Sequence, residues 1–522
     1  MLRYTASADL SLMRLPRDEL PQGRRLGSNG VLSGALHTLG YVSAPDQKQT
    51  LLFARNCKPL TSRNACGCSS YAPSQYSTDV CLGNPGRRFD LIIDTGSSIT
   101  AVPCSTCKKC GPHRCGRTGC FDMGRSLSAS AVDCRQPPAG FSCERCATDR
   151  CGYSVHYTEG SAIQGHVVTD EAHFTRTVSA AEPGSVMEER IRTRVFFGCQ
   201  TLETGMFYKQ EADGIMGLQP PRARARVPSV LTSLVQQRQA TEAFSLCLAD
   251  RRGLFLLGGR PDKAALAVRR TLTVPMQRNA RARYTLDLRD VRVSGSGRSN
   301  GTFSSLKLPV STYAPTLVDS GTTFVYASTP LYRAIHAHVK QHTPSLTREG
   351  GKVCAHLTPQ QLGSMPSMEL IFSSSSQPLV VRPQQYMVEF PKSSSVTWRS
   401  NTRHYCVAVF DNQRGGTVIG ASIMRQREVI FDLVASTISF ADANCDTITP
   451  ATSHLKDPYS FAPCPTGGGK QMPNRSLAEA QTGIFSRLGV RKRNGDAVRD
   501  AKHRALVRAR QTASARVGDA SA

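Results

Sequence analysis

The sequence predicts a mostly β protein built from two related halves, and three observations support this prediction. Between about residues 79 and 446, short segments rich in Val, Ile, Phe and Leu alternate with Gly, Pro and Ser turns, as in strands joined by tight connections. An apolar run that ends in an Asp turn occurs twice, at 89–104 and at 314–326. The chain of 522 residues is long enough for two domain-sized units.

The clearest predicted strands are RFDLIID, HVVTDEAHF, RVFFGC, LFLLGG, YTLDLRDVRV and REVIFDL. Only PSVLTSLVQQRQ and TPLYRAIHAHVKQH are long enough for helices. We expect four parts. Residues 1–78 form an N-terminal extension or propeptide with a Cys/Ser-rich insertion, and residues 79–250 form an N-terminal lobe with a Cys-rich insert at 104–151. Residues 251–446 form a C-terminal lobe, and residues 447–522 form a disordered tail that is first Pro/Gly-rich and then basic.

The formal charge of +26 is compatible with nucleic acid or an anionic membrane as a partner. However, Arg is spread along the whole chain, and no aromatic-flanked basic motif of a nucleic-acid module occurs. We therefore interpret the charge as a compositional bias and expect no nucleic-acid partner. No run of 18 apolar residues occurs that predicts a transmembrane segment, and the N-terminus lacks the apolar core of a signal peptide.

The 19 cysteines allow two interpretations. Nine lie within 104–151, where CSTCKKC and CERC have metal-like spacing, whereas the others are scattered singly through both halves. Scattered cysteines favour disulfides over a zinc module, and sequons at Asn300 and Asn474 fit the secretory pathway. We expect no metal or cofactor, and an endomembrane compartment, such as the endoplasmic reticulum, or the extracellular space.

The two Asp turns share a second element further along the chain. Asp94 begins DTGSS and is followed by the apolar-apolar-Gly segment 215–217, and Asp319 begins DSGTT and is followed by the similar segment 418–420. A single Asp in such a turn is an ordinary turn former. Two carboxylates held close together share one proton and provide an acid and a base, a chemistry that does not require a metal.

These repeats resemble the pepsin-type aspartic proteases over about residues 79–446. The resemblance implies two β-rich lobes with the active site in the cleft between them, where Asp94 and Asp319 activate a water molecule for peptide hydrolysis. It also assigns supporting roles to three residue pairs, namely Gly96 and Gly321 for close backbone approach, Thr95 and Ser320 for bracing the two loops, and Ser97 and Thr322 for hydrogen bonds to the carboxylates.

The segment VHYTEGSAIQGHVVTD resembles the family's flap hairpin, with Tyr157 as the flap tyrosine and Glu159 and Gly160 facing the substrate. Ala101 stands where the family has the tryptophan that bonds this tyrosine. The Cys-rich insert before the flap resembles nepenthesin-like members and the plasmepsin V group. This resemblance implies cleavage of secretory-pathway proteins at an Arg-containing motif, with Glu159 meeting the arginine.

The resemblance further implies a disulfide between Cys354 and Cys406 in the C-terminal lobe. We expect a monomer that acts on polypeptides. The alternative function is a catalytically inactive inhibitor or binding protein on the same fold, since some relatives have lost an Asp or its neighbours. Both Asp turns are intact in this sequence.

Overall fold

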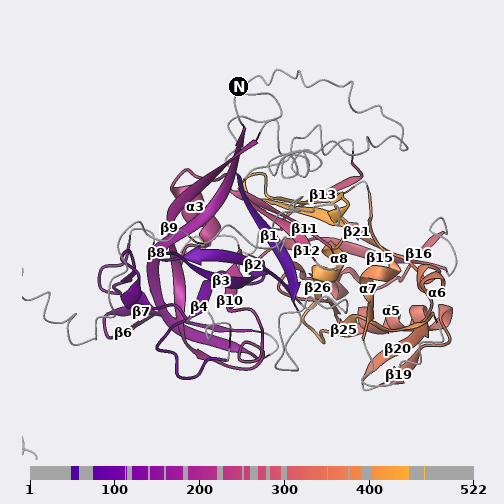
Figure 1. The fold of residues 1–522 in the computed structure, drawn as a ribbon. Helices are drawn as coiled ribbons and strands as arrows, with labels where there is room; N and C mark the ends of the chain where they lie inside the picture. Colours follow the sequence, from indigo (N-terminus) through magenta and orange to yellow (C-terminus); the bar gives the residue numbers. More distant parts are fainter. Residues whose placement is uncertain are drawn as a thin grey trace, which may run out of the picture. The chain divides into compact units, whose positions relative to one another are not determined.

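The computed structural model describes residues 49–57, 75–111, 113, 120–138, 141–157, 160–179, 186–219, 227–249, 252–258, 269–277, 283–295, 302–349, 351–373, 375, 377–390, 401–445 and 464. Strands predominate and helices are few (Figure 1), so the prediction of a mostly β protein is confirmed.

The largest sheet combines strands from both halves of the chain (Figure 1). Its neighbouring strands are, in order, β13 (Thr271–Pro275), β28 (Thr437–Asp442), β27 (Arg427–Asp432), β11 (Ala243–Leu248), β12 (Arg252–Leu257), β1 (Gln49–Cys57), β2 (Gln75–Leu82), β3 (Arg87–Asp94), β10 (Gly214–Gly217), β4 (Thr100–Pro103), β9 (Val186–Glu203), β8 (Ala162–Ser179), β7 (Arg150–His156) and β6 (Arg145–Ala147), while β5 (Ser130–Ala131) pairs with β8. Because β27 pairs with β11, the end of the second half is hydrogen-bonded to the first half.

Three smaller sheets form the rest of the second half. The five-stranded sheet has the order β14 (Thr285–Leu286), β17 (Thr316–Asp319), β26 (Thr417–Gly420), β18 (Val325–Ala327) and β25 (Val409–Asp411). The two four-stranded sheets have the orders β16 (Phe303–Ser305), β15 (Leu288–Ser294), β21 (Met368–Phe372), β22 (Leu379–Val381), and β19 (Thr347–Glu349), β20 (Lys352–Leu357), β24 (Arg403–Val407), β23 (Met387–Glu389).

One predicted strand is divided between two sheets. The segment YTLDLRDVRV forms β14, which pairs with β17, and then β15, which pairs with β21. The change occurs at Asp287, whose carboxylate accepts hydrogen bonds from Arg289 at the surface. The sequence pattern does not reveal such a change of partner, because apolar residues on both sides of Asp287 are buried.

The two predicted helices are confirmed. They are α3 (Val230–Gln236) and α5 (Thr329–His342), and α5 buries Leu331, Ile335 and Val339 along one face. The other helical elements among the described residues are short, namely η2 (Met123–Arg125), η3 (Val310–Thr312), α6 (Pro359–Gly363), α7 (Pro383–Tyr386) and α8 (Ala421–Met424). Among the described residues, no helix has the length and apolar character needed to cross a membrane.

The region expected to be an N-terminal extension contributes to the largest sheet. Strand β1 pairs with both β12 and β2, and residues 58–74 of the Cys/Ser-rich insertion connect β1 to β2. The insertion thus lies in sequence between two strands that pair with each other. Of the tail, only Cys464 lies within the described residues, and both sequon asparagines, Asn300 and Asn474, lie outside them.

The disulfide interpretation of the cysteines is confirmed. The insert contains Cys107–Cys110, Cys134–Cys146 and Cys143–Cys151, and Cys104 bonds Cys199. Three further bridges are Cys354–Cys406, Cys247–Cys445 and Cys81–Cys464, the last of which joins residues 383 positions apart.

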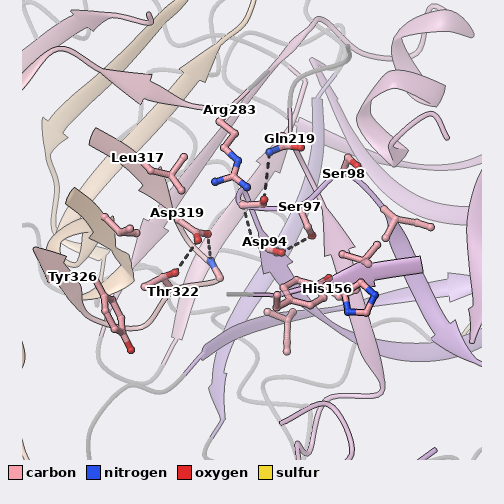
Figure 2. Close-up of a pocket in the computed structure, with 18 of the residues that line it drawn as sticks. Asp94, Ser97, Ser98, His156, Gln219, Arg283, Leu317, Asp319, Thr322 and Tyr326 are labelled. Atoms are coloured by element: carbon pink, nitrogen blue, oxygen red, sulfur yellow. Dashed lines mark hydrogen bonds between the residues drawn. The ribbon is translucent and has the colours of Figure 1, made fainter. Parts of the chain in front are cut away.

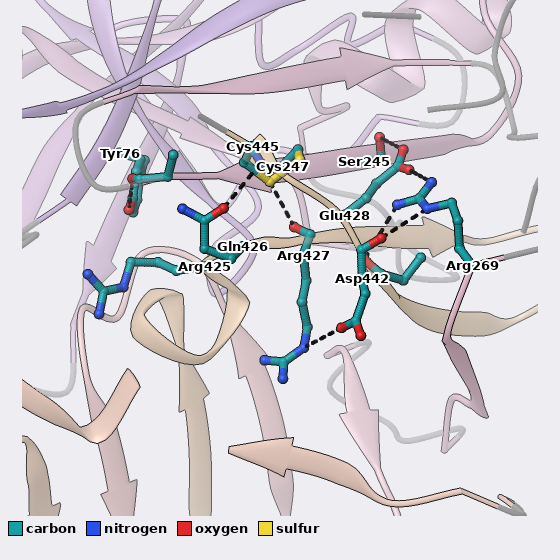
Figure 3. Close-up of a disulfide and its surroundings, with 12 residues drawn as sticks. Tyr76, Ser245, Cys247, Arg269, Arg425, Gln426, Arg427, Glu428, Asp442 and Cys445 are labelled. Atoms are coloured by element: carbon teal, nitrogen blue, oxygen red, sulfur yellow. Dashed lines mark hydrogen bonds and ion pairs between the residues drawn. A yellow bond between two sulfur atoms is a disulfide. The ribbon is translucent and has the colours of Figure 1, made fainter. Parts of the chain in front are cut away.

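The Cys247–Cys445 bridge joins the two halves and lies beside a buried ion pair of the second half (Figure 3). The Glu428 side chain is fully buried and contacts Arg269 at 2.7 Å, and it accepts a hydrogen bond from Ser245 of the first half at 2.9 Å. Because a buried carboxylate needs such partners, these contacts fix β27 against β11.

Candidate active site

The two Asp turns lie at the ends of corresponding strands. Strand β3 runs parallel to β10 and pairs Asp94 with Gly217, while β17 runs parallel to β26 and pairs Asp319 with Gly420. The apolar-apolar-Gly element therefore lies beside each Asp turn. Both glycines are required sterically, because an added Cβ would meet Ile99 N at 2.5 Å or Phe324 O at 2.0 Å.

The two turns approach each other closely at their glycines. A Cβ added to Gly96 would lie 2.6 Å from Asp319 Oδ2, and one added to Gly321 would lie 2.3 Å from Asp94 Oδ1. Each glycine thus packs against the carboxylate of the opposite turn. A residue with a side chain would separate the carboxylates.

Reciprocal hydrogen bonds connect the second residues of the turns. Thr95 Oγ1 donates to Val318 O at 3.1 Å and accepts from Ser320 N at 2.9 Å. Ser320 Oγ donates to Ile93 O at 2.7 Å and accepts from Thr95 N at 3.1 Å. Both hydroxyls are buried, so this network holds the two turns in one relative position.

Each carboxylate also accepts two hydrogen bonds from its own turn (Figure 2). Ser97 Oγ donates to Asp94 Oδ2 at 2.5 Å, and Thr322 Oγ1 donates to Asp319 Oδ2 at 2.7 Å. The other oxygen accepts from the amide two residues further on, at 2.7 Å in the first turn and 2.9 Å in the second. These bonds fix the orientation of both carboxylates.

The two carboxylates differ in their surroundings. The Asp94 side chain is buried, with 4% exposure, whereas Asp319 is half-buried. Burial and the neighbouring Asp319 carboxylate raise the pKa of Asp94 to about 8, although the hydrogen bonds from Ser97 and Gly96 act in the opposite direction. Both effects favour the protonated form of Asp94, and two adjacent carboxyl groups of this kind titrate as a pair that shares one proton.

The flap hairpin consists of β7 and β8. Tyr157 follows β7 and lines the cleft, and its ring packs against Phe207 with centroids 4.8 Å apart. Phe207 and Ala101, which stands at the position of the family's tryptophan, belong to one buried apolar cluster against which Tyr157 packs. Gly160 has a φ of +92° at the hairpin tip, whereas Glu159 lies outside the described residues.

Several residues that line the cleft beside the dyad were not predicted. Figure 2 shows His156, Gln219, Arg283, Leu317 and Tyr326 around the two aspartates. Leu317 and Tyr326 lie in the segment of the second Asp turn, and His156 directly precedes Tyr157, so the sequence offered a signal for these three. Gln219 and Arg283 belong to no motif of the sequence.

Two His/Cys groups have potential metal-ligand atoms within 4.8 Å of one another. One contains His166 and the other His404, each beside two cysteines. In both groups the cysteine sulfurs are bonded to each other as a disulfide. Each group as it stands therefore offers only an imidazole, which does not make a metal-ligand set.

Two family models match the chain. Residues 76–259 match the model described as xylanase inhibitor N-terminal, and residues 283–442 match the one described as xylanase inhibitor C-terminal. Together they cover more than half of the chain and include both Asp turns. The chain belongs to the pepsin-like aspartic protease family.

Similar proteins come from parasites and plants. Aspartic protease 5 of Toxoplasma gondii is 26% identical over 404 residues, which cover 72% of this chain but only 37% of that protein. Aspartic proteinase 39 of Arabidopsis thaliana is 26% identical over 399 residues, 71% of this chain and 75% of the plant protein. Plasmepsin V of Plasmodium falciparum is 28% identical over 189 residues, 36% of this chain and 30% of that protein.

Proposed function

We propose that this protein is an aspartic endopeptidase in which Asp94 and Asp319 are the catalytic residues. The observation that carries the proposal is the contact between two oriented carboxylates, one of which has its pKa raised to about 8. They line a cleft bounded by the flap tyrosine, Tyr157. Peptide hydrolysis requires this combination of one acid, one base and room for an extended peptide.

The unequal burial of the carboxylates suggests how they divide the reaction. Asp94 is the more buried and keeps the proton, so it donates a hydrogen bond to the scissile carbonyl. The Asp319 carboxylate removes a proton from a water molecule between the two side chains. As that water attacks the carbonyl carbon, the carbonyl oxygen takes the Asp94 proton, which gives a tetrahedral gem-diol without a covalent enzyme intermediate. The C–N bond then breaks while Asp319 gives its proton to the leaving amine and Asp94 regains a proton from the gem-diol.

Cleavage of a peptide library tests this proposal. We expect cleavage that pepstatin, a peptide mimic of the tetrahedral intermediate, inhibits. The matching family models carry the description xylanase inhibitor, so the second candidate is an inactive inhibitor or binding protein. That candidate predicts no cleavage by a folded sample at any pH from acidic to mildly alkaline.

We further propose that the enzyme prefers arginine on the non-primed side of the scissile bond, through Glu159 of the flap. The similarity to plasmepsin V and the Y-x-E-G-S pattern at Tyr157–Ser161 support this idea. A flap carboxylate closes over the substrate, and a guanidinium fits it better than an ammonium because of its planar fork.

The test compares kcat/KM for paired Arg, Lys and Ala peptides. We expect the wild-type enzyme to prefer the Arg peptide over the Lys peptide, and the Lys peptide over the Ala peptide. Glu159→Gln should abolish this order. The control Glu144→Gln, which removes another carboxylate of the cleft, should leave it unchanged. Equal values for the Arg and Ala peptides in the wild-type enzyme refute the proposal. Selectivity that persists in Glu159→Gln assigns it to a different residue.

The disulfides and the similarity to plasmepsin V suggest an oxidising endomembrane compartment or the extracellular space. We propose a monomer whose partner is its polypeptide substrate. Light scattering during gel filtration tests the oligomeric state, and fractionation of cells tests the compartment.

A further inference from the structure

We infer that Arg283 is a specificity-determining residue of the cleft, where it binds a carboxylate side chain of the peptide substrate beside the scissile bond. The inference rests on the proposed endopeptidase function and adds to it a preference for a negatively charged substrate side chain. Three observations carry it: the strand register, the alternation of side chains, and the charge of one cleft wall.

The register places the Arg283 backbone at the level of the dyad. Strand β14 is antiparallel to β17, with Thr285 opposite Leu317. One residue earlier, Tyr284 O accepts a hydrogen bond from Val318 N at 2.8 Å. Continuing this register sets Arg283 opposite Asp319, and opposed residues of antiparallel strands have Cα atoms about 4.5–5.5 Å apart.

Side-chain alternation turns Arg283 toward the cleft. Residues two apart on a strand face the same side, and Thr285 and Leu317 both line the cleft. Arg283 is two residues from Thr285, Asp319 is two residues from Leu317, and both also line the cleft. Tyr284 points the other way, where it is fully buried and donates to Leu218 O at 2.6 Å, so the backbone next to Arg283 is firmly held.

Arg283 contributes a positive charge to the wall of the cleft beside the two carboxylates. Figure 2 shows its guanidinium above the two aspartates, between Gln219 and Leu317, with His156 below them. The neighbouring lining residues Gln277 and Thr285 are polar but neutral. Arg283 itself is exposed, so a peptide in the cleft can reach its side chain, which carries five N–H donors.

The ligand that this geometry favours is a carboxylate. A guanidinium binds a carboxylate through two parallel hydrogen bonds, whereas an amide of the same size offers it only one acceptor oxygen. An extended peptide advances about 3.3 Å per residue. A side chain that starts opposite Asp319 therefore reaches substrate residues within about two positions of the scissile bond.

The test uses peptide pairs that carry Glu or Gln at each of the three positions on either side of the scissile bond. At one position we expect the wild-type enzyme to prefer Glu about tenfold in kcat/KM, which corresponds to about 1.4 kcal/mol. Arg283→Gln should bring this ratio to about one, and Arg283→Glu should instead favour Lys at that position. The preference should decrease as salt rises from about 0.05 to about 0.5 M.

Arg414→Gln is the matched control, because Arg414 is another described arginine that lines the cleft. It should keep the wild-type ratio. A ratio of one at every position in the wild-type enzyme contradicts the inference, and so does an equal loss in the Arg283 and Arg414 variants. Arg283→Gln could instead keep the Glu/Gln ratio in kcat/KM and shift the pH dependence of kcat/KM. That result would contradict the inference and show that Arg283 acts on the two aspartates.

A binding measurement separates this inference from the proposed activity. Fluorescent peptides with a reduced amide at the scissile bond report Kd by anisotropy without cleavage. Glu-selective binding that Arg283→Gln abolishes supports the inference even for a protein that cleaves nothing, an outcome that contradicts only the endopeptidase proposal. Equal Kd for the Glu and Gln peptides, or no binding of either, contradicts the inference.

Discussion

The two Asp turns have the same backbone frame but different environments. In both, a parallel strand pairs the Asp with a Gly, and in both a hydroxyl three residues further on donates to the carboxylate. Yet Asp94 is buried while Asp319 is half-buried, and the pKa of Asp94 is raised. The comparison teaches that one backbone frame can place two carboxylates in unequal surroundings, because burial differs between the turns although their sequences are similar.

The halves around these turns also differ in their covalent links. In the described part of the chain, four disulfides lie within or next to the Cys-rich insert of the first half, whereas Cys354–Cys406 lies in the second. The strands that carry Cys354 and Cys406 pair directly in a small four-stranded sheet. The bridges of the first half therefore range from a separation of 3 residues at Cys107–Cys110 to 95 at Cys104–Cys199, whereas Cys354–Cys406 has an intermediate separation of 52.

The strongest test of the Asp94–Asp319 comparison is to remove one carboxylate at a time. Asp94→Asn and Asp319→Asn should each lower kcat by about four orders of magnitude or more, because an amide neither accepts the water proton nor shares one with its partner. Circular dichroism should show an unchanged fold. A variant that retains a tenth of the wild-type kcat would exclude that residue from the dyad.

Loss of a disulfide should have the next largest effect and tests the difference between the halves. The Cys354–Cys406 bridge spans 52 residues, and chain entropy predicts that replacing both cysteines by Ala lowers the free energy of unfolding by about 4 kcal/mol. The same change at Cys107 and Cys110, which are 3 residues apart, should cost only about 2 kcal/mol. Urea unfolding measures both, and equal losses would contradict the loop-length argument.

The approach of each glycine to the opposite carboxylate predicts a smaller loss. Gly321→Ala places a Cβ against Asp94 and should lower kcat about a hundredfold, which corresponds to an increase of about 2.7 kcal/mol in the activation free energy. Gly96→Ala should have a smaller effect, because its added Cβ would lie 2.6 Å from the nearest atom, compared with 2.3 Å for Gly321. Gly295→Ala is the control, since no atom lies within 4 Å of its added Cβ. Activity in Gly321→Ala equal to the control would show that the turns can separate freely.

The smallest expected effect is on how the free energy of unfolding depends on pH, which tests whether the buried Asp94 favours its protonated form. A folded-state pKa raised to about 8 means that the native protein binds the Asp94 proton more tightly than the unfolded chain. The contribution of Asp94 to the free energy of unfolding is fully present below the ordinary carboxyl pKa. It is lost as the pH rises toward 8, by about 1.4 kcal/mol per pH unit. Asp94→Asn should show a smaller fall across this range.

Urea unfolding at several pH values measures this effect. The exposed residue Asp149 supplies the control, because Asp149→Asn removes a carboxylate with 55% side-chain exposure. The control should follow the wild-type curve. If Asp94→Asn also follows that curve, the burial of Asp94 does not favour its neutral form.

The sequence predicts the parts of the site that repeat. The Asp turns and apolar-apolar-Gly segments are local patterns whose second copy removes the ambiguity of the first. Arg283 could not be predicted, because its position depends on a register between β14 and β17 that involves residues far apart in the chain. Phe207 was missed for the same reason, since its contact with Tyr157 joins two separate segments.

The Cys81–Cys464 bridge affects how limited proteolysis of this protein must be interpreted. Since it joins a strand of the first half to a residue beyond the last described strand, residues 81–464 form a covalently closed ring. A single nick inside that ring opens it without releasing a fragment. Proteolytic maturation there would therefore leave the band unchanged on a non-reducing gel, and only reduction would separate the pieces.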